Sequence, residues 1–149
     1  MSIGNFSKIL VAIDGSKMSM KAAEYGVVMA KKDNAVLIAL NVIYTPASTF
    51  TYTKKTWFDE FLKKSKDEAK EWFNKIKKNA TEKEVKIKTE TVEEIYSVPA
   101  GIIKYAEKEN INLIIMGSTG KTGFKRLLLG SVANEVVVHS PIPVMVIKS

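Results

Sequence analysis

Two hydrophobic periodicities alternate along the chain. Residues 8–13, 35–43, 111–116 and 142–148 are short, nearly continuous apolar runs rich in branched side chains, a pattern typical of strands that are covered on both faces of a sheet. Residues 84–92 instead alternate strictly between apolar or threonine positions and charged ones, which predicts a strand with one face in water, at an edge of the sheet. The pattern therefore predicts five strands.

Segments with helical periodicity separate the predicted strands. Ser16 and Ser97 are favoured N-cap residues, and Pro99 suits the first turn of the helix that follows Ser97. A Thr-rich loop after Tyr44 leads into the longest helix, whose apolar face is expected to pack on the sheet. The helices are predicted over residues 17–33, 57–78, 98–109 and 131–140.

This order of elements favours a doubly wound α/β fold. Short parallel strands joined by right-handed helical crossovers form a five-stranded parallel sheet with helices on both faces. The predicted strand order, 3-2-1-4-5, places the half-polar third strand at one edge and the fifth at the other. No helix follows the fifth strand, so its uncovered apolar side predicts a homodimer through residues 142–148. Residues 1–149 are predicted to form a single domain.

The net charge of +7 raises the question of nucleic-acid binding. Residues 54–88 hold 12 Lys, but 7 acidic residues are interleaved with them, and Arg126 is the only arginine of the chain. This pattern indicates a solvated helix face, so no nucleic-acid partner is expected. The chain has no cysteine and no apolar run of membrane-spanning length, which predicts a cytoplasmic protein without a membrane partner.

Residues 117–131 read GSTGKTGFKRLLLGS and directly follow a predicted buried strand. The triplet Gly120-Lys121-Thr122 matches the end of a Walker A phosphate loop, but that motif needs a glycine at position 115, where this chain has Ile115. The loop is therefore not a Walker A loop. Its glycines stand at 117, 120, 123 and 130, and Ser131 follows the last of them at the predicted start of a helix.

The glycine loop and Asp14 are predicted to meet. Ligands of open parallel sheets bind at the carboxyl ends of the strands where the strand order reverses, here between strands 1 and 4. Asp14 ends the first strand, and the loop follows the fourth. Glycines let the backbone approach phosphate closely, and the N–H groups at a helix start suit an anion. A carboxylate can accept from ribose hydroxyls or help to hold a divalent ion, so a nucleotide fits all of these features.

Each feature also has a purely structural interpretation. The glycines can be turn residues, Asp14 can begin a turn with Gly15, and Ser131 can act only as an N-cap. Lys121 and the two cations after it can be a solvated run, or charges that favour a nearby phosphate. These alternatives stay open at the level of the sequence.

The segment IIMGSTGKTGFKRLLLGSVANEVVVHSPIPVMVIK resembles the C-terminal signature of the universal stress protein family, in particular its ATP-binding branch, with G-x-x-G, nine residues, then G-[ST]. KILVAIDGS near the N-terminus and ALNVI in the second predicted strand extend the resemblance along the chain. The resemblance implies an adenine nucleotide alpha hydrolase-like fold, bound ATP with Mg²⁺ or Mn²⁺, and a homodimer joined through the last strand. Thr119 departs from many members, which carry His at that place.

The resemblance also implies roles for single positions. Asp14 and Gly117 would lie by the ribose, and the backbone of Val42 would read the edge of the adenine. Asp14 is also the candidate for an indirect contact to the metal ion. The remaining candidates would line the adenine pocket, hold the phosphates or belong to the same loop, in that order: Ala12 and Met116; Gly120, Gly130, Ser131 and Val132; Ser118 and Lys121.

Nothing in the sequence predicts efficient catalysis. The only histidine, His139, stands two helical turns beyond Ser131, and no Ser-His-Asp or metal-ligand cluster is apparent. A nucleotide-dependent regulatory or stress-response dimer is therefore favoured, with slow hydrolysis at most and a protein partner that the sequence does not identify. The alternative is a nucleotide-free interaction module of the same fold. An ATP pyrophosphatase or nucleotidylyltransferase is disfavoured, because the loop after the first strand contains only Gly15.

Overall fold

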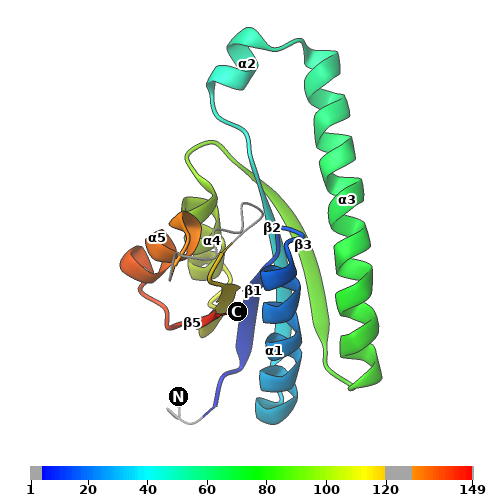
Figure 1. Ribbon diagram of the computed structural model, residues 1–149, viewed down its shortest axis with the longest axis vertical. Helices are drawn as coiled ribbons and strands as arrows, with labels where there is room; N and C mark the ends of the chain where they lie inside the picture. The colour runs from blue at the N-terminus through cyan, green and yellow to red at the C-terminus, as the bar shows by residue number, and fades with distance from the viewer. Residues whose placement is uncertain (1–4, 120–128, 149) are drawn as a thin grey trace.

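The computed structural model describes residues 5–119 and 129–148. Its centre is a sheet of five strands: β1 (Lys8–Ala12), β2 (Val36–Tyr44), β3 (Ile87–Glu94), β4 (Leu113–Gly117) and β5 (Val144–Ile147). All neighbouring strands are parallel, and their order is β3-β2-β1-β4-β5 (Figure 1). The predicted fold class and strand order are therefore confirmed.

Helices cover both faces of this sheet: α1 (Lys17–Asp33) and α3 (Lys55–Glu82) on one, and α4 (Val98–Lys108) and α5 (Ser131–His139) on the other (Figure 1). Consecutive residues of β1 alternate between the two faces. Ile9 and Val11 belong to the core beneath α1 and α3, whereas Leu10 belongs to the core beneath α4 and α5. All three are fully buried, and each contributes about 1.5–3 kcal/mol through burial. This two-sided burial explains why the strand is continuously apolar.

The observed elements differ from the predicted ones mainly at their ends. α3 is longer than predicted at both ends. The loop expected after Tyr44 contains a short helix, α2 (Ser48–Tyr52). β3 starts at Ile87, so Val85, which was expected inside the strand, precedes it.

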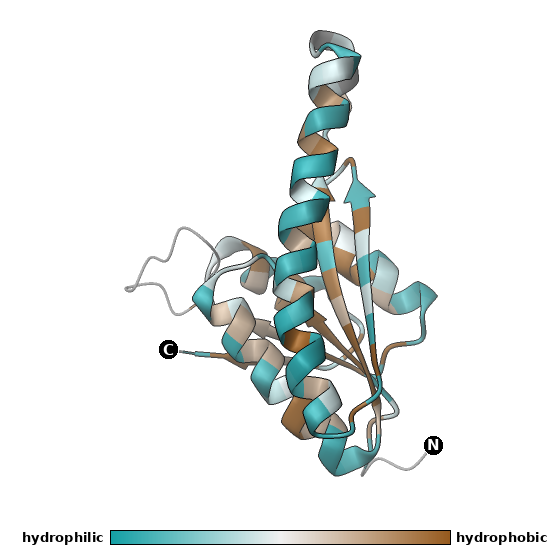
Figure 2. Cartoon of the chain, turned by 90° about the vertical axis from the view of Figure 1, so that its right-hand side faces the viewer, coloured by the Kyte–Doolittle hydropathy of each residue, from teal (hydrophilic) through white to brown (hydrophobic). Residues whose placement is uncertain are grey.

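The N-terminal half of α3 extends beyond the sheet. At 1.5 Å per residue its 28 residues span about 42 Å, whereas the nine residues of β2 span about 30 Å. Figure 2 shows the upper part of α3 standing clear of the strands. Ala69, Phe73 and Ile76 are buried on the sheet, but Trp57 and Phe61 are 54% and 37% exposed. The expectation that the apolar face packs on the sheet is therefore correct for only the C-terminal half.

No helix in the described parts of the chain is long and apolar enough to cross a membrane.

The amino end of the sheet is closed by side-chain hydrogen bonds. Asn112, just before β4, accepts three of them at Oδ1: from the Ser7 backbone N–H (2.8 Å), the Ser7 hydroxyl (2.7 Å) and the Lys8 backbone N–H (2.6 Å). The backbone N–H of Phe6 donates to Asp33 Oδ2 at 2.9 Å. These contacts fix the start of β1 between β4 and the end of α1.

A further polar contact crosses from α4 to the half-polar edge strand. The Tyr105 hydroxyl donates to Glu90 Oε2 at 3.0 Å. Burial raises the pKa of Tyr105 above its ordinary value, and the hydrogen bond to Glu90 raises it further. The phenol therefore stays protonated in the folded chain well into the alkaline range.

Candidate functional site

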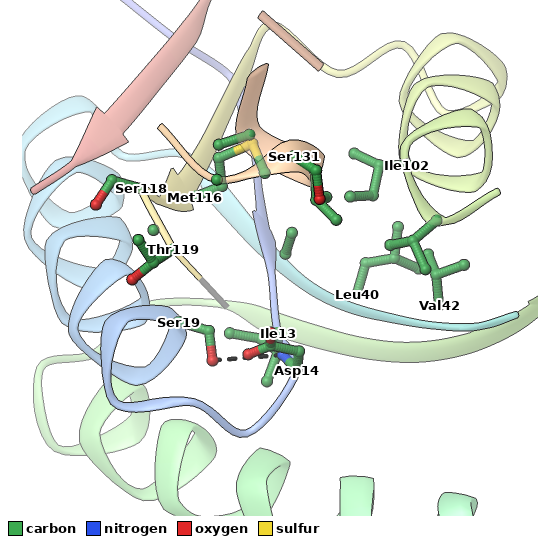
Figure 3. Close-up of a pocket in the computed structure, with 16 residues that line it drawn as sticks. Ile13, Asp14, Ser19, Leu40, Val42, Ile102, Met116, Ser118, Thr119 and Ser131 are labelled. Atoms are coloured by element: carbon green, nitrogen blue, oxygen red, sulfur yellow. Dashed lines mark hydrogen bonds between the residues drawn. The ribbon is translucent and has the colours of Figure 1, made fainter. Parts of the chain in front are cut away.

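A cavity of about 490 Å³ opens at the carboxyl ends of β1, β2 and β4 (Figure 3). It lies at the point where the strand order reverses between β1 and β4, as expected for ligand sites of doubly wound sheets. The N-termini of α4 and α5 complete its walls. The cavity has an apolar half and a polar half, and the two arise from different elements.

Aliphatic and thioether side chains form the apolar half. They are Ala12, Leu40, Val42, Val98, Ile102 and Met116. Because β1 pairs with β2 only as far as Ala12 and Leu40, β2 continues past the end of its neighbour. Leu40 accepts from the Ile13 N–H on the β1 side, and Val42, two residues further on, presents its backbone to the same side. The backbone of Val42 thus faces the cavity next to an apolar wall, which suits the edge of a flat heterocycle.

The N-terminus of α5 forms the polar half. α1 and α4 are capped by serines: Ser16 Oγ accepts from Ser19 N–H and Ser97 Oγ accepts from Ala100 N–H, each at 3.1 Å. The N-cap of α5 is Gly130, which makes no side-chain cap hydrogen bond. The alternative in which Ser131 is the N-cap is therefore wrong, because Ser131 is the first helical residue. The first-turn N–H groups of α5 keep no capping side chain, and they lie beside the cavity.

Gly130 also approaches the end of β4 closely. Its N–H donates to the Ser118 carbonyl at 2.6 Å, and a Cβ added to it would lie 3.2 Å from the same oxygen. Gly117 is similarly close to α1, because an added Cβ would lie 2.8 Å from Met18 Cβ and 2.9 Å from the Met18 carbonyl carbon. Gly130 lets α5 approach the end of β4, and Gly117 lets α1 approach it. Gly130 therefore allows close packing of α5 against the end of β4, and its N–H is already used by the Ser118 carbonyl.

Asp14 sits in a tight turn after β1. Its Oδ1 accepts from the Ser16 N–H at 2.9 Å, and its own N–H donates to Ser19 Oγ at 3.3 Å (Figure 3). Gly15 has φ +82°, a value that side chains disfavour, and a Cβ there would overlap the Trp72 indole. The turn interpretation of Asp14 is thus correct, and the same half-buried carboxylate also lines the cavity.

Nine of the residues predicted for the site line this cavity: Ala12, Asp14, Val42, Met116, Gly117, Ser118, Gly130, Ser131 and Val132. Gly120 and Lys121 lie outside the described residues, as do Lys125 and Arg126. Sequence reasoning missed Val98 and Ile102, although their spacing by four residues after the cap Ser97 places them on one helix face. Within residues 5–119 and 129–148, no group of three or more His, Cys, Asp or Glu side chains is arranged to hold a metal ion.

The strand order and the position of the cavity define a Rossmann-like, doubly wound α/β protein. Comparison with known sequences is more specific. The sequence model of the universal stress protein family matches residues 5–148, so this chain belongs to the universal stress protein family.

Relatives of known name agree with this assignment. A universal stress protein of Methanocaldococcus jannaschii is 40% identical over 96% of this chain and 82% of its own length. The universal stress protein YxiE of Bacillus subtilis is 36% identical over 96% of this chain and 99% of its own.

Solved structures of the family share the fold. The universal stress protein UspA of Lactobacillus plantarum superposes with a TM-score of 0.83 at 27% identity, covering 97% of this chain and 99% of that one. Two more distant members also have the same fold. One, from Arabidopsis thaliana, was solved with AMP bound (TM-score 0.68, 17% identity, 95% and 91% of the two chains). The other, from Archaeoglobus fulgidus, was solved with dAMP (TM-score 0.71, 18% identity, 95% and 98%).

Proposed function

We propose that this chain binds ATP, with Mg²⁺ or Mn²⁺, in the 490 Å³ cavity and acts as a nucleotide-dependent regulatory dimer of the ATP-binding branch of its family. The observation that carries the proposal is the division of the cavity into an apolar wall and an uncapped helix N-terminus. An adenine ring and a phosphate chain need these two environments side by side. Relatives with AMP and dAMP support an adenine nucleotide as the ligand class.

Each part of the nucleotide has a matching part of the cavity. The adenine packs between the aliphatic side chains, and its polar edge pairs with the backbone of Val42. The ribose hydroxyls donate to the Asp14 carboxylate, next to Gly117. The phosphates lie at the start of α5, where the N–H groups of Ser131 and Val132 point outward from the helix and its dipole favours negative charge. A bound Mg²⁺ or Mn²⁺ would neutralise phosphate charge, and Asp14 is the residue that would contact it indirectly.

Hydrolysis by this arrangement is slow. A rapid ATPase needs a base or a water-orienting group beside the γ-phosphate. The single histidine, His139, is exposed at the far end of α5 from the cavity. We therefore propose that the bound nucleotide is a signal that changes the surface offered to a protein partner. A cytoplasmic location for this activity stays a prediction.

The dimer forms through β5. This strand lies at the edge of the sheet, and among the described strands it pairs only with β4. Its Val144, Met145 and Val146 are only half-buried, and Val137 and Val138 on neighbouring α5 are 42% and 64% exposed. An edge strand beside exposed valines is a surface that a second copy would cover.

Calorimetric titration of the nucleotide-free chain with Mg-ATP tests the proposal. We expect saturation near one ATP per chain, and light scattering on the same sample is expected to give the mass of a dimer. Gly130→Val should weaken binding by about 100-fold or more, because its branches enter the space between Ser118 and the α5 N-terminus. Asn134→Val, an exposed change on the same helix, is the matched control and should bind like the parent. A folded Gly130→Val variant with parental affinity would overturn the placement of the phosphates.

A further inference from the structure

A second cavity, of about 410 Å³, lies on the other side of the Asp14 turn. It opens between the carboxyl end of β2 and the part of α3 that begins to leave the sheet. Asp14 and Val42 border both cavities, whereas Asn41, Tyr44, Phe61, Glu68 and Trp72 border only this one among the residues that the structure describes. The nucleotide proposal does not use this cavity.

Aromatic rings form much of its wall. Tyr44 is 47% exposed and Phe61 is 37% exposed, and Trp72 is half-buried against Gly15. Phe61 is supported from behind by Trp57, with parallel rings whose centroids are 5.5 Å apart. Three aromatic side chains from β2 and α3 that keep part of their surface open around one cavity provide faces on which a flat or cationic group can rest.

The floor of the cavity contains a buried hydrogen-bond acceptor. Asn41 is 7% exposed, and its Nδ2 donates to the Ile13 carbonyl at 2.8 Å. Because that carbonyl requires a donor, the other atom of the amide is the oxygen. Within residues 5–119 and 129–148, this Oδ1 accepts no hydrogen bond, and no buried side-chain oxygen there lacks both a partner and contact with solvent. Asn41 Oδ1 therefore opens into the cavity as an unused acceptor.

The charges of the cavity favour a cation. Asp14 and Glu68 contribute two carboxylates, and Lys64, exposed on α3, is the only cation among the lining residues that the structure describes. The local balance is thus negative in a chain of net charge +7. The cavity supplies acceptors and aromatic faces together, and that combination is complementary to a group with several N–H donors, positive charge and a planar shape.

We propose that this second cavity binds a guanidinium group, stacked on the aromatic wall and donating to Asn41 Oδ1 and to the two carboxylates. The group belongs to a small molecule or to an arginine side chain of a partner polypeptide, since both present the same chemistry. The inference goes beyond nucleotide binding and does not depend on it.

Tryptophan fluorescence provides the test. The chain has two tryptophans, and Trp57→Phe leaves Trp72, which lines the cavity, as the only reporter while keeping a ring against Phe61. We expect N-acetylarginine amide to change the Trp72 emission saturably, with a Kd on the order of 1 mM. N-acetylcitrulline amide has the same shape without the charge and should bind at least about tenfold more weakly. Calorimetry on the parent chain repeats the comparison without the reporter.

Variants on the exposed face of α3 assign the binding to this cavity. Glu68→Gln removes one lining carboxylate and should weaken arginine binding by about fivefold to tenfold. Glu71→Gln, an exposed change on the same helix outside the cavity, is the control and should have no effect. Tighter binding of an arginine-containing pentapeptide than of agmatine would identify a polypeptide source, and the reverse a small molecule. Equal binding of the arginine and citrulline amides, insensitivity to Glu68→Gln, or no saturable binding at about 10 mM would each overturn the proposal.

Discussion

The polar groups at the amino end of the sheet are hydrogen-bonded within the chain, whereas several of those at the carboxyl end are not. At the amino end, one oxygen of Asn112 accepts three hydrogen bonds, and the chain closes around it. At the carboxyl end, the buried Asn41 donates through its nitrogen, and its oxygen accepts from no described residue. The N-cap of α5 is Gly130, which provides no capping side chain. The polar groups that hold the fold together are thus separated from those that remain for a ligand. The first end stabilises the fold, and the second is the end at which we propose that ligands bind.

The largest effect on nucleotide affinity is expected from filling the cavity at the carboxyl end of the sheet. Ala12→Leu places three more carbon atoms into the 490 Å³ cavity, where the adenine would lie. We expect nucleotide affinity to fall by more than about 100-fold. The midpoint of thermal unfolding should stay the same or rise, because new apolar surface is buried in existing space.

Ala12→Ser, which keeps nearly the same volume, should retain parental affinity in the same calorimetric titration. A cooperative loss of stability in Ala12→Leu would show that the two ends are not separate, since a binding residue would then also support the fold.

The next effect is expected at the closed end. Asn112→Ala removes the acceptor of three donors, and we expect the free energy of unfolding to fall by about 2–3 kcal/mol. Chemical denaturation measures this change. Asn112→Asp keeps an acceptor at the same place and should lose much less.

ATP affinity of the folded Asn112→Ala variant should equal that of the parent, because the contact lies at the opposite end of the strands from the cavity. A tenfold loss of affinity in this variant would contradict the proposed separation.

The smallest effect is expected from the hydrogen bond between Tyr105 and Glu90, which lies midway between the two ends of the sheet. Because the pKa of Tyr105 is higher in the folded chain than the value of 10.0 for a free phenol, its protonated form adds stability that is fully present below pH 10. This stability is lost as pH rises from 10 towards the folded-state pKa, since only the unfolded chain then releases the proton. Over that interval the slope is about 1.4 kcal/mol per pH unit.

Tyr105→Phe should therefore cost about 1 kcal/mol at neutral pH and lose stability less steeply than the parent above pH 10. Urea unfolding at several pH values measures both. Tyr25→Phe, at an exposed tyrosine, is the control and should keep the parental slope. Parental behaviour of the Tyr105→Phe variant would mean that neither the burial of the hydroxyl nor its contact with Glu90 raises the pKa in solution.

The sheet could be predicted from the sequence because the hydrophobic pattern of each strand indicates which of its faces are covered. Leu10, Leu37 and Ile114 are buried on a covered face and belong to continuous apolar runs, whereas the alternation around Lys88 marks the strand at an edge of the sheet. The expectation of one face in water is wrong for that strand, because Glu94 is buried and Glu90 contacts Tyr105 of α4. The serine caps of α1 and α4 were predictable for the same local reason. Topology placed Asp14 and the glycine loop at the site, since strand ends that meet at a reversal are fixed by strand order. Ala12, Val42, Met116 and Val132 were expected only from the family resemblance.

Features that depend on the relative length of elements could not be predicted. Trp57 and Phe61 are four residues apart, and Phe73 and Ile76 are three apart, so each pair lies on one helix face, but only the second pair is buried on the sheet. Periodicity identifies the apolar face of a helix and says nothing of where the sheet under it ends. The second cavity is a product of this mismatch, because it forms where α3 leaves β2. The cap at Gly130 was missed because serine is the commoner N-cap, and glycine reads as a turn residue.

The Asp14 turn has a thermodynamic consequence. Its carboxylate borders both cavities, and the Trp72 indole rests on its glycine. Any ligand that changes the charge or position of Asp14 from one side changes the affinity on the other, and energy conservation makes this influence equal in both directions. The binding equilibria of the two cavities then belong to one thermodynamic cycle. With both proposed ligands bound, the chain would respond to the joint presence of two molecules and not simply to the concentration of either.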